Sequence, residues 1–180
     1  MAPTLTCWYL RMLPVAMPSW PPRYTTTSAE PMLIARLIPL EATYPLRLLV
    51  LRPGGALADC HFESDLVDGG FHVGTFTGDA CIAVGSFSPE AHPELPAERP
   101  YRLRGMATHP DHQGTGAGKS LMRTAFAEIE ERGGDRLWCN ARAIAVPFYL
   151  RMGLRIHGAP FEIPGIGTHH VMHRSFTGEG

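Results

Sequence analysis

The stretch His109-Pro110-Asp111-His112-Gln113-Gly114-Thr115-Gly116-Ala117-Gly118-Lys119-Ser120 decides the fold of this chain. It separates a β-rich run, Tyr101–Thr108, from the run Gly118–Arg132, in which apolar residues recur at helical spacing. Three glycines at alternate positions let backbone N–H groups converge, and the N-terminus of the helix behind them favours an anion. The stretch therefore predicts a strand, a phosphate-binding loop and a helix in succession.

Two other phosphate-binding loops do not fit this stretch. The nucleoside-triphosphate loop, G-x-x-x-x-G-K-S, needs a glycine at the position that Gln113 occupies. No hydrophobic strand ending in aspartate follows to hold magnesium. The dinucleotide fingerprint G-x-G-x-x-G fails because the third glycine comes one residue early. The pattern that remains is Gln-Gly-x-Gly-x-Gly.

Apolar patterns on both sides of the loop predict a mixed α+β domain. Strands are expected at Leu33–Ile38, Phe71–Thr77, Ala80–Phe87, Tyr101–Thr108, Arg136–Asn140, Leu154–Ile163 and His169–Phe176, and helices at Leu40–Leu51, Gly118–Arg132 and Ala143–Met152. Gly78-Asp79 between two of the strands is a hairpin signal. The order β-α-β-β-β-α-β-α-β-β predicts helices packed on the faces of a mixed sheet.

The first 31 residues differ from the rest of the chain, because proline is dense among them. Proline removes backbone donors and blocks both helix and inner strand. We expect residues 1–31 to be a disordered extension, or sequence ahead of a start at Met32, and residues 32–177 to form one domain. The alternative is an arm that packs on a partner subunit through Trp8, Tyr9 and Trp20.

Composition excludes several classes of partner. A formal net charge of −1 gives no basic bias toward nucleic acid. No apolar run is long enough to span a membrane, and no signal peptide is indicated. The four cysteines form no C-x-x-C pair, so a cytoplasmic location fits and no zinc or redox motif is indicated. The histidine clusters lack a matching second ligand pair, so we expect no metal.

A second pattern follows the glycine loop: Asn140-Ala141-Arg142, and then Phe148-Tyr149-Leu150-Arg151-Met152-Gly153-Leu154. Together with Met106–Gly118 it resembles the two motifs of the GNAT acyltransferase superfamily, in a bacterial-type member. The resemblance covers roughly Met32–Phe176. It implies a central mixed, mostly antiparallel sheet of about six to seven strands flanked by about four helices. It also implies an N-acetyltransferase that moves an acetyl group directly from acetyl-CoA to a primary amine.

The resemblance also implies roles for individual residues. The cofactor-binding set comprises Met106, Ala107, Thr108, Gln113, Gly114, Thr115, Gly116, Ala117, Gly118, Lys119 and Asn140. Backbone groups of Met106 and Thr108 would hold the pantetheine arm where the fourth and fifth strands splay apart, and the amides of residues 113–119 would hold the pyrophosphate. Lys119 adds charge there or is solvated, and Asn140 holds the cofactor or caps the next helix.

Tyr149 matches the family tyrosine that protonates the departing thiolate. A phenol with a pKa near 10 can donate a proton to a thiolate of similar basicity. The alternative is a core tyrosine on the apolar face of a helix beside Phe148.

The general base and the acceptor are not predicted. Many relatives carry a glutamate on the fourth strand, where this chain reads Tyr101-Arg102-Leu103-Arg104. Arg104 either binds an anionic acceptor or forms a surface ion pair. Glu63, His72 and His170 are candidates for a base that acts through water. The missing carboxylate leaves a non-catalytic acyl-CoA-binding module as an alternative, and sheet edges suggest a homodimer.

Overall fold

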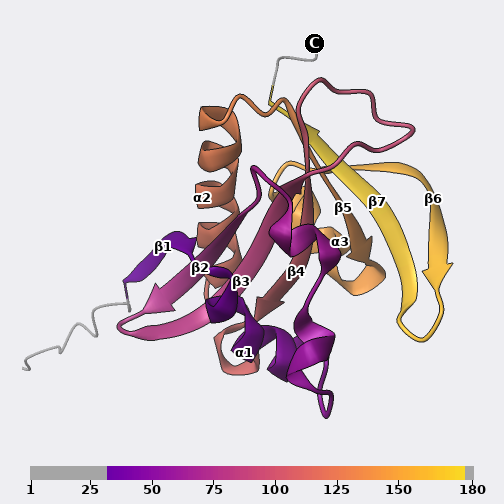
Figure 1. Cartoon of the computed structure of the whole chain (residues 1–180). Helices are drawn as coiled ribbons and strands as arrows, with labels where there is room; N and C mark the ends of the chain where they lie inside the picture. The colour runs from indigo at the N-terminus through magenta and orange to yellow at the C-terminus, as the bar shows by residue number, and fades with distance from the viewer. Residues whose placement is uncertain (1–31, 177–180) are drawn as a thin grey trace, which may run out of the picture. The chain divides into compact units, whose positions relative to one another are not determined.

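The computed structural model describes residues 32–176; the predicted N-terminal extension, residues 1–31, lies outside this range, as do residues 177–180. Seven strands form one mixed sheet in the order β1-β2-β3-β4-β5-β7-β6 (Figure 1). Every neighbouring pair is antiparallel except β4 and β5, which run parallel. The mixed, mostly antiparallel sheet expected from the sequence is therefore confirmed.

The strands lie within one or two residues of their expected positions. Their bounds are β1 Leu33–Ile38, β2 Phe71–Thr77, β3 Ala80–Pro89, β4 Pro100–Thr108, β5 Arg136–Arg142, β6 Arg155–Ile163 and β7 Gly167–Ser175. The hairpin between β2 and β3 turns at Gly78, which adopts a positive φ of 55°.

All three expected helices are present, but the first and the third are less regular than the second. The first is a continuous helical segment of 3-10, α and π turns, Leu40–Leu51, whose central turn is α1 (Tyr44–Leu46). The second is α2 (Ala117–Glu131), and a 3-10 turn at Ala143–Ala145 leads into α3 (Val146–Arg151). Three further 3-10 turns, Leu57–Cys60, Glu63–Leu66 and Pro110–His112, were not predicted as helical, because a single turn carries no apolar periodicity.

The main core lies between α2 and one face of the sheet. The helix buries one apolar stripe, made of Leu121, Met122, Ala125, Phe126 and Ile129. The stripe packs on sheet residues that include Phe87, Leu103 and Leu137. Complete burial of each large side chain contributes about 1.5–3 kcal/mol. This packing fixes α2, and with it the glycine loop, against the ends of the central strands.

A smaller cluster covers the opposite face of the sheet. Leu46 of the first helical segment packs there on Val84 of β3 and Ala107 of β4. The face is opposite because Val84 precedes Gly85, whose Cβ position points at Leu121 of α2. None of the helices between residues 32 and 176 is long and apolar enough to cross a membrane.

Candidate active site

The central parallel strands β4 and β5 pair over only a short distance. Their ladder comprises Pro100 with Arg136, Tyr101 with Leu137, and Arg102 with Trp138, and among the described residues it goes no further. Next along β4, Gly105 has a positive φ of 59°, and the register with β3 shifts opposite it. A bulge of this kind bends a strand. Past Arg102, β4 therefore has a backbone edge that β5 does not pair (Figure 1).

Met106 and Thr108 direct their backbone groups toward this unpaired edge. The His109 N–H donates to the Ile82 carbonyl of β3 at 2.8 Å. Because successive residues of a strand direct their N–H and C=O groups to alternate sides, Ala107 also faces β3, whereas Met106 and Thr108 face the β5 side. The unpaired N–H and C=O groups of Met106 and Thr108 can bind an extended ligand as an added strand. The Ala107 backbone lies on the other side of the strand.

Tyr149 of α3 lies at the same place. It is buried, and its Oη donates to Met106 Sδ at 3.5 Å, a contact with a weak acceptor. Burial raises the pKa of Tyr149 well above 10, with a smaller contribution from Cys139 of β5. Gly118 lets α2 approach this site, since a Cβ there would lie 3.2 Å from Met106 Cε and 3.3 Å from the Phe148 ring. The phenol thus stays protonated where β4 and β5 separate.

The glycine loop leaves the N-terminus of α2 open to an anion. Gly114 and Gly116 adopt positive φ values of 78° and 93°, which glycine accommodates without strain. Gly116 is the N-cap of α2, and no side chain hydrogen bond caps this end. The Ser120 N–H makes the first bond of the helix, to the Gly116 carbonyl at 2.9 Å. The amides of residues 117–119 precede that bond, so they remain available to a phosphate.

The other loop positions differ in what they offer a ligand. The Gln113 N–H already donates to the Pro110 carbonyl at 3.2 Å, so its amide is engaged. Thr115 is exposed, and its hydroxyl donates to the His112 carbonyl at 2.7 Å. Lys119 is also exposed, in the first turn of α2. The open part of the predicted phosphate site therefore begins after Gln113.

Asn140 lies on β5 beyond the last residue that pairs with β4, and it is half-buried. The N-cap positions that follow are Arg142 for the 3-10 turn and Ala145 for α3. The alternative in which Asn140 caps the next helix is therefore wrong. Its position beside the unpaired edge of β4 leaves the ligand-binding role as a prediction.

A carboxylate that the sequence did not reveal lies over β4. Glu90, just after the end of β3, forms an ion pair with Arg102 through Oε1, and Arg104 Nη2 lies 3.2 Å from the same oxygen. Trp138 Nε1 donates to the Glu90 carbonyl at 2.8 Å and so fixes this segment. Burial lowers the pKa of Arg102, although the hydrogen bond that Arg102 donates to Glu90 acts to raise it. The proline-rich loop between β3 and β4 hides this pairing from sequence reasoning.

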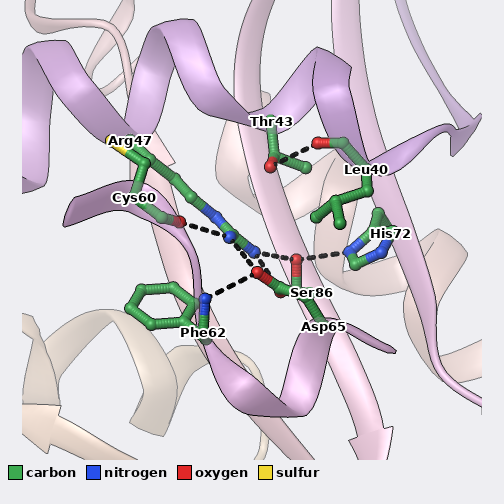
Figure 2. Close-up of polar contacts among 8 residues, drawn as sticks. All are labelled: Leu40, Thr43, Arg47, Cys60, Phe62, Asp65, His72 and Ser86. Atoms are coloured by element: carbon green, nitrogen blue, oxygen red, sulfur yellow. Dashed lines mark hydrogen bonds and ion pairs between the residues drawn. The ribbon is translucent and has the colours of Figure 1, made fainter. Parts of the chain in front are cut away.

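A buried polar network joins the first helical segment to the sheet (Figure 2). Arg47 is fully buried, and its Nη1 and Nη2 contact the two oxygens of Asp65 at 2.6 and 2.7 Å. Nη1 also donates to the Cys60 carbonyl at 2.8 Å, and Nη2 donates to Ser86 Oγ. His72 Nδ1 lies 2.6 Å from the same hydroxyl. The network ties two turns and two strands to one guanidinium.

The network also reaches His72. Ser86 Oγ accepts from Arg47 and lies beside His72 Nδ1, and its second lone pair or its own proton can each complete that contact, so either ring nitrogen can carry the proton of the neutral ring. Burial lowers the pKa of His72, so the neutral ring persists at neutral pH. A role of His72 as a base stays a prediction.

The other base candidates, Glu63 and His170, lie on different elements. Glu63 is exposed at the start of a 3-10 turn. His170 lies on β7 opposite Ala141 of β5, and its buried Nδ1 has no hydrogen-bond partner among residues 32–176. The same residues contain no group of three histidine, cysteine, aspartate or glutamate side chains arranged to hold a metal ion. The Tyr149 hydroxyl contacts Met106 and none of these candidates, so the identity of the base stays a prediction.

Comparison with known proteins identifies the family of this chain. Residues 41–154, more than half of the chain, match the acetyltransferase (GNAT) family. The chain is 39% identical over 144 residues to the uncharacterized N-acetyltransferase YitI of Bacillus subtilis, covering 80% of this chain and 97% of YitI. The family match includes the glycine loop and Tyr149.

Solved structures show the same fold. Escherichia coli ElaA superposes with a TM-score of 0.64 at 18% identity, over 79% of this chain and 99% of ElaA. An aminoglycoside 6'-N-acetyltransferase complexed with coenzyme A superposes with a TM-score of 0.61 at 12% identity, over 82% of this chain and 99% of that chain. The family match and the relative together show that this chain is an acyltransferase that belongs to the GNAT N-acetyltransferase family.

Proposed function

We propose that this acyltransferase transfers an acetyl group from acetyl-CoA directly to a primary amine. The observation that carries the proposal is the position of Tyr149, whose buried hydroxyl contacts Met106 where β4 and β5 separate. An acid placed beside an unpaired strand edge suits a thioester held along that edge. The open N-terminus of α2 beyond it suits the pyrophosphate of the same ligand.

Each part of the site has one task in the proposed reaction. Met106 and Thr108 hold the pantetheine amides through backbone hydrogen bonds, and the amides of residues 117–119 hold the pyrophosphate. The neutral amine attacks the thioester carbonyl, so a C–N bond forms and the C–S bond breaks. Tyr149 gives its proton to the departing thiolate. The amine nitrogen releases its extra proton to water, because β4 carries arginines in place of a carboxylate, and the Tyr149 phenolate regains a proton from water.

The proposal also covers the location and the assembly of the protein. A cytosolic location is supported by the free thiols of Cys60, Cys81 and Cys139 among the described residues. Pairing of two chains through the edge strands β1 or β6 stays a prediction.

The second candidate function is a non-catalytic acyl-CoA-binding module. The observation that favours it is the engagement of Glu90, whose carboxylate is shared by Arg102 and Arg104. A carboxylate in two ion pairs does not readily take a proton from an amine.

Release of free coenzyme A thiol separates the two functions. The purified chain is incubated with acetyl-CoA and a panel of primary amines, while calorimetry measures acetyl-CoA binding separately. The proposed enzyme releases thiol in an amine-dependent manner and forms the acetylated amine, detected by mass. Tight binding of acetyl-CoA without acceptor-dependent thiol release would show the binding module instead.

A further inference from the structure

Arg104 lies on β4 directly before the Gly105 bulge, two residues from Met106. Arg102 and Arg104 are alternate residues of one strand, so they share a face of the sheet. That face is opposite the one on which Leu103 packs against α2. Both guanidinium groups therefore project from the face of the sheet that α2 does not cover. An acceptor that approaches the unpaired edge from this face meets them first.

The positive charge on this face exceeds the negative charge that neutralises it. Among residues 32–176, Glu90 supplies the only carboxylate that contacts Arg102 or Arg104, and it contacts both. Arg102 is held more firmly, because it bonds Glu90 closely and lies over the Trp138 ring at 4.2 Å. One guanidinium charge in the pair thus remains without a counter-ion.

The uncompensated group is Arg104. Its contacts with Glu90 are longer, 3.2 and 3.3 Å, and both come from Nη2. The Nε of each arginine is buried without a hydrogen-bond partner, but 35% of the Arg104 side chain remains exposed, against 14% for Arg102. Arg104 therefore keeps donors to offer to a ligand that arrives from solvent.

We propose that Arg104 binds an oxyanion on the acceptor, so that the natural acceptor is a primary amine that also carries a carboxylate or a phosphate. This inference rests on the proposed function, because it assigns the substrate class of the same site. A guanidinium recognises either oxyanion through charge-assisted hydrogen bonds. Binding of the anion supplies the missing negative charge and also relieves the repulsion between two neighbouring guanidinium groups.

Matched pairs of amines test the proposal. Glycine, β-alanine and γ-aminobutyrate are each compared with their amides, and O-phosphoethanolamine is compared with ethanolamine. Thiol release gives kcat/KM for the wild type, Arg104→Gln and Arg104→Lys. Arg123→Gln, which removes an exposed arginine from α2, is the matched control. Each compound is compared with itself across variants, so differences in amine basicity cancel.

We expect Arg104→Gln to lower kcat/KM by about tenfold for the anionic member of at least one pair, as loss of a charged hydrogen bond predicts. The neutral partner should be unaffected, Arg104→Lys should restore part of the loss, and Arg123→Gln should change nothing. A loss confined to the phosphate pair or to the carboxylate pairs identifies which oxyanion is used. Equal losses for both members of every pair, with turnover intact, overturn the inference and leave the proposed function standing.

Equilibrium binding covers the case in which no amine is acetylated. Calorimetry then measures the same pairs against protein saturated with coenzyme A. Binding of an anionic member that Arg104→Gln abolishes upholds the inference while the proposed function falls. Absence of Arg104-dependent binding overturns both. Thermal melting of each variant shows that it is folded, and Arg104→Lys carries the test where Arg104→Gln melts early.

Discussion

Tyr149 combines two properties that a proton donor needs. Its hydroxyl contacts the thioether of Met106, a weak acceptor, so the O–H is not committed to a strong hydrogen bond. Burial keeps the pKa of the phenol above its usual value, so the proton is present at neutral and moderately alkaline pH. A tyrosine that served packing alone would gain nothing from a hydroxyl in this position.

Replacement of Tyr149 by phenylalanine tests that role. The ring and its packing remain, so we expect kcat to fall by about 100-fold or more, as loss of a general acid predicts, with little change in acetyl-CoA affinity. Tyr101→Phe is the matched control, because it also removes a buried phenol hydroxyl, one that lies 3.4 Å from the Gly69 carbonyl. Unchanged turnover in Tyr149→Phe would show that the proton comes from elsewhere.

The pH dependence of the reaction provides a second test at this residue. Because burial raises the pKa of Tyr149 above 10, its proton is not lost below that pH. The acceptor amine becomes neutral as pH rises, so kcat/KM should increase about tenfold per pH unit up to the pKa of the amine, without a falling limb below about pH 10. A rate measurement across pH checks this. A decline that begins near pH 8 would contradict the assignment.

At the scale of elements, the bulge in β4 determines where β4 and β5 separate. Gly105 adopts a left-handed backbone, and a Cβ there would lie 2.7 Å from the Phe62 ring and 2.8 Å from Arg47 Nε. The buried guanidinium therefore lies against the bulge. The position of the unpaired edge depends on the close fit between Gly105 and this side chain.

Gly105→Ala should therefore destabilise the fold by more than the strain of placing alanine in a left-handed backbone would alone. Gly78→Ala is the matched control, since Gly78 has a similar φ of 55° but open space around its Cβ position. We expect about 1 kcal/mol of destabilisation from strain in Gly78→Ala and about 1–3 kcal/mol more in Gly105→Ala, measured by urea unfolding. Equal effects would mean that the contact with Arg47 and Phe62 does not constrain the bulge.

Elements with a strong period could be predicted from the sequence, and elements fixed by distant contacts could not. Alternating residues and the glycine-rich turns were enough to predict all seven strands and α2. Arg47 stands within an apolar run and bonds Asp65 and Ser86, 18 and 39 residues away, so nothing local distinguishes it from a surface arginine. Glu90 was missed for the same reason.

At the scale of the whole molecule, the network around Arg47 links stability to pH. Burial acts to raise the pKa of Asp65, but hydrogen bonds from Arg47 and the Phe62 N–H outweigh it and lower the pKa below its usual 3.8. Stability from this pair is therefore present above that value and is lost in acid. Burial lowers the pKa of His72, so the unfolded chain takes up a proton at a higher pH than the folded protein.

His72 should therefore make the protein less stable as pH falls below about 6.5, its usual pKa. The slope from one such group is at most about 1.4 kcal/mol per pH unit. His72→Gln should reduce the slope of unfolding free energy between pH 6.5 and the folded pKa, measured by urea titration at each pH. An unchanged slope would contradict the assignment of a neutral His72 in the folded protein.

The proposed binding of acetyl-CoA at the N-terminus of α2 can be tested directly by one comparison. Thr115 is exposed in the glycine loop, so Thr115→Glu adds a negative charge there, and Thr115→Gln is its matched neutral control. Calorimetry at low salt compares acetyl-CoA with acetyl-pantetheine, which lacks the pyrophosphate. We predict that Thr115→Glu binds acetyl-CoA about tenfold more weakly than Thr115→Gln, with equal affinities for acetyl-pantetheine. Equal acetyl-CoA affinities in the two variants would show that the pyrophosphate does not bind at this end of α2.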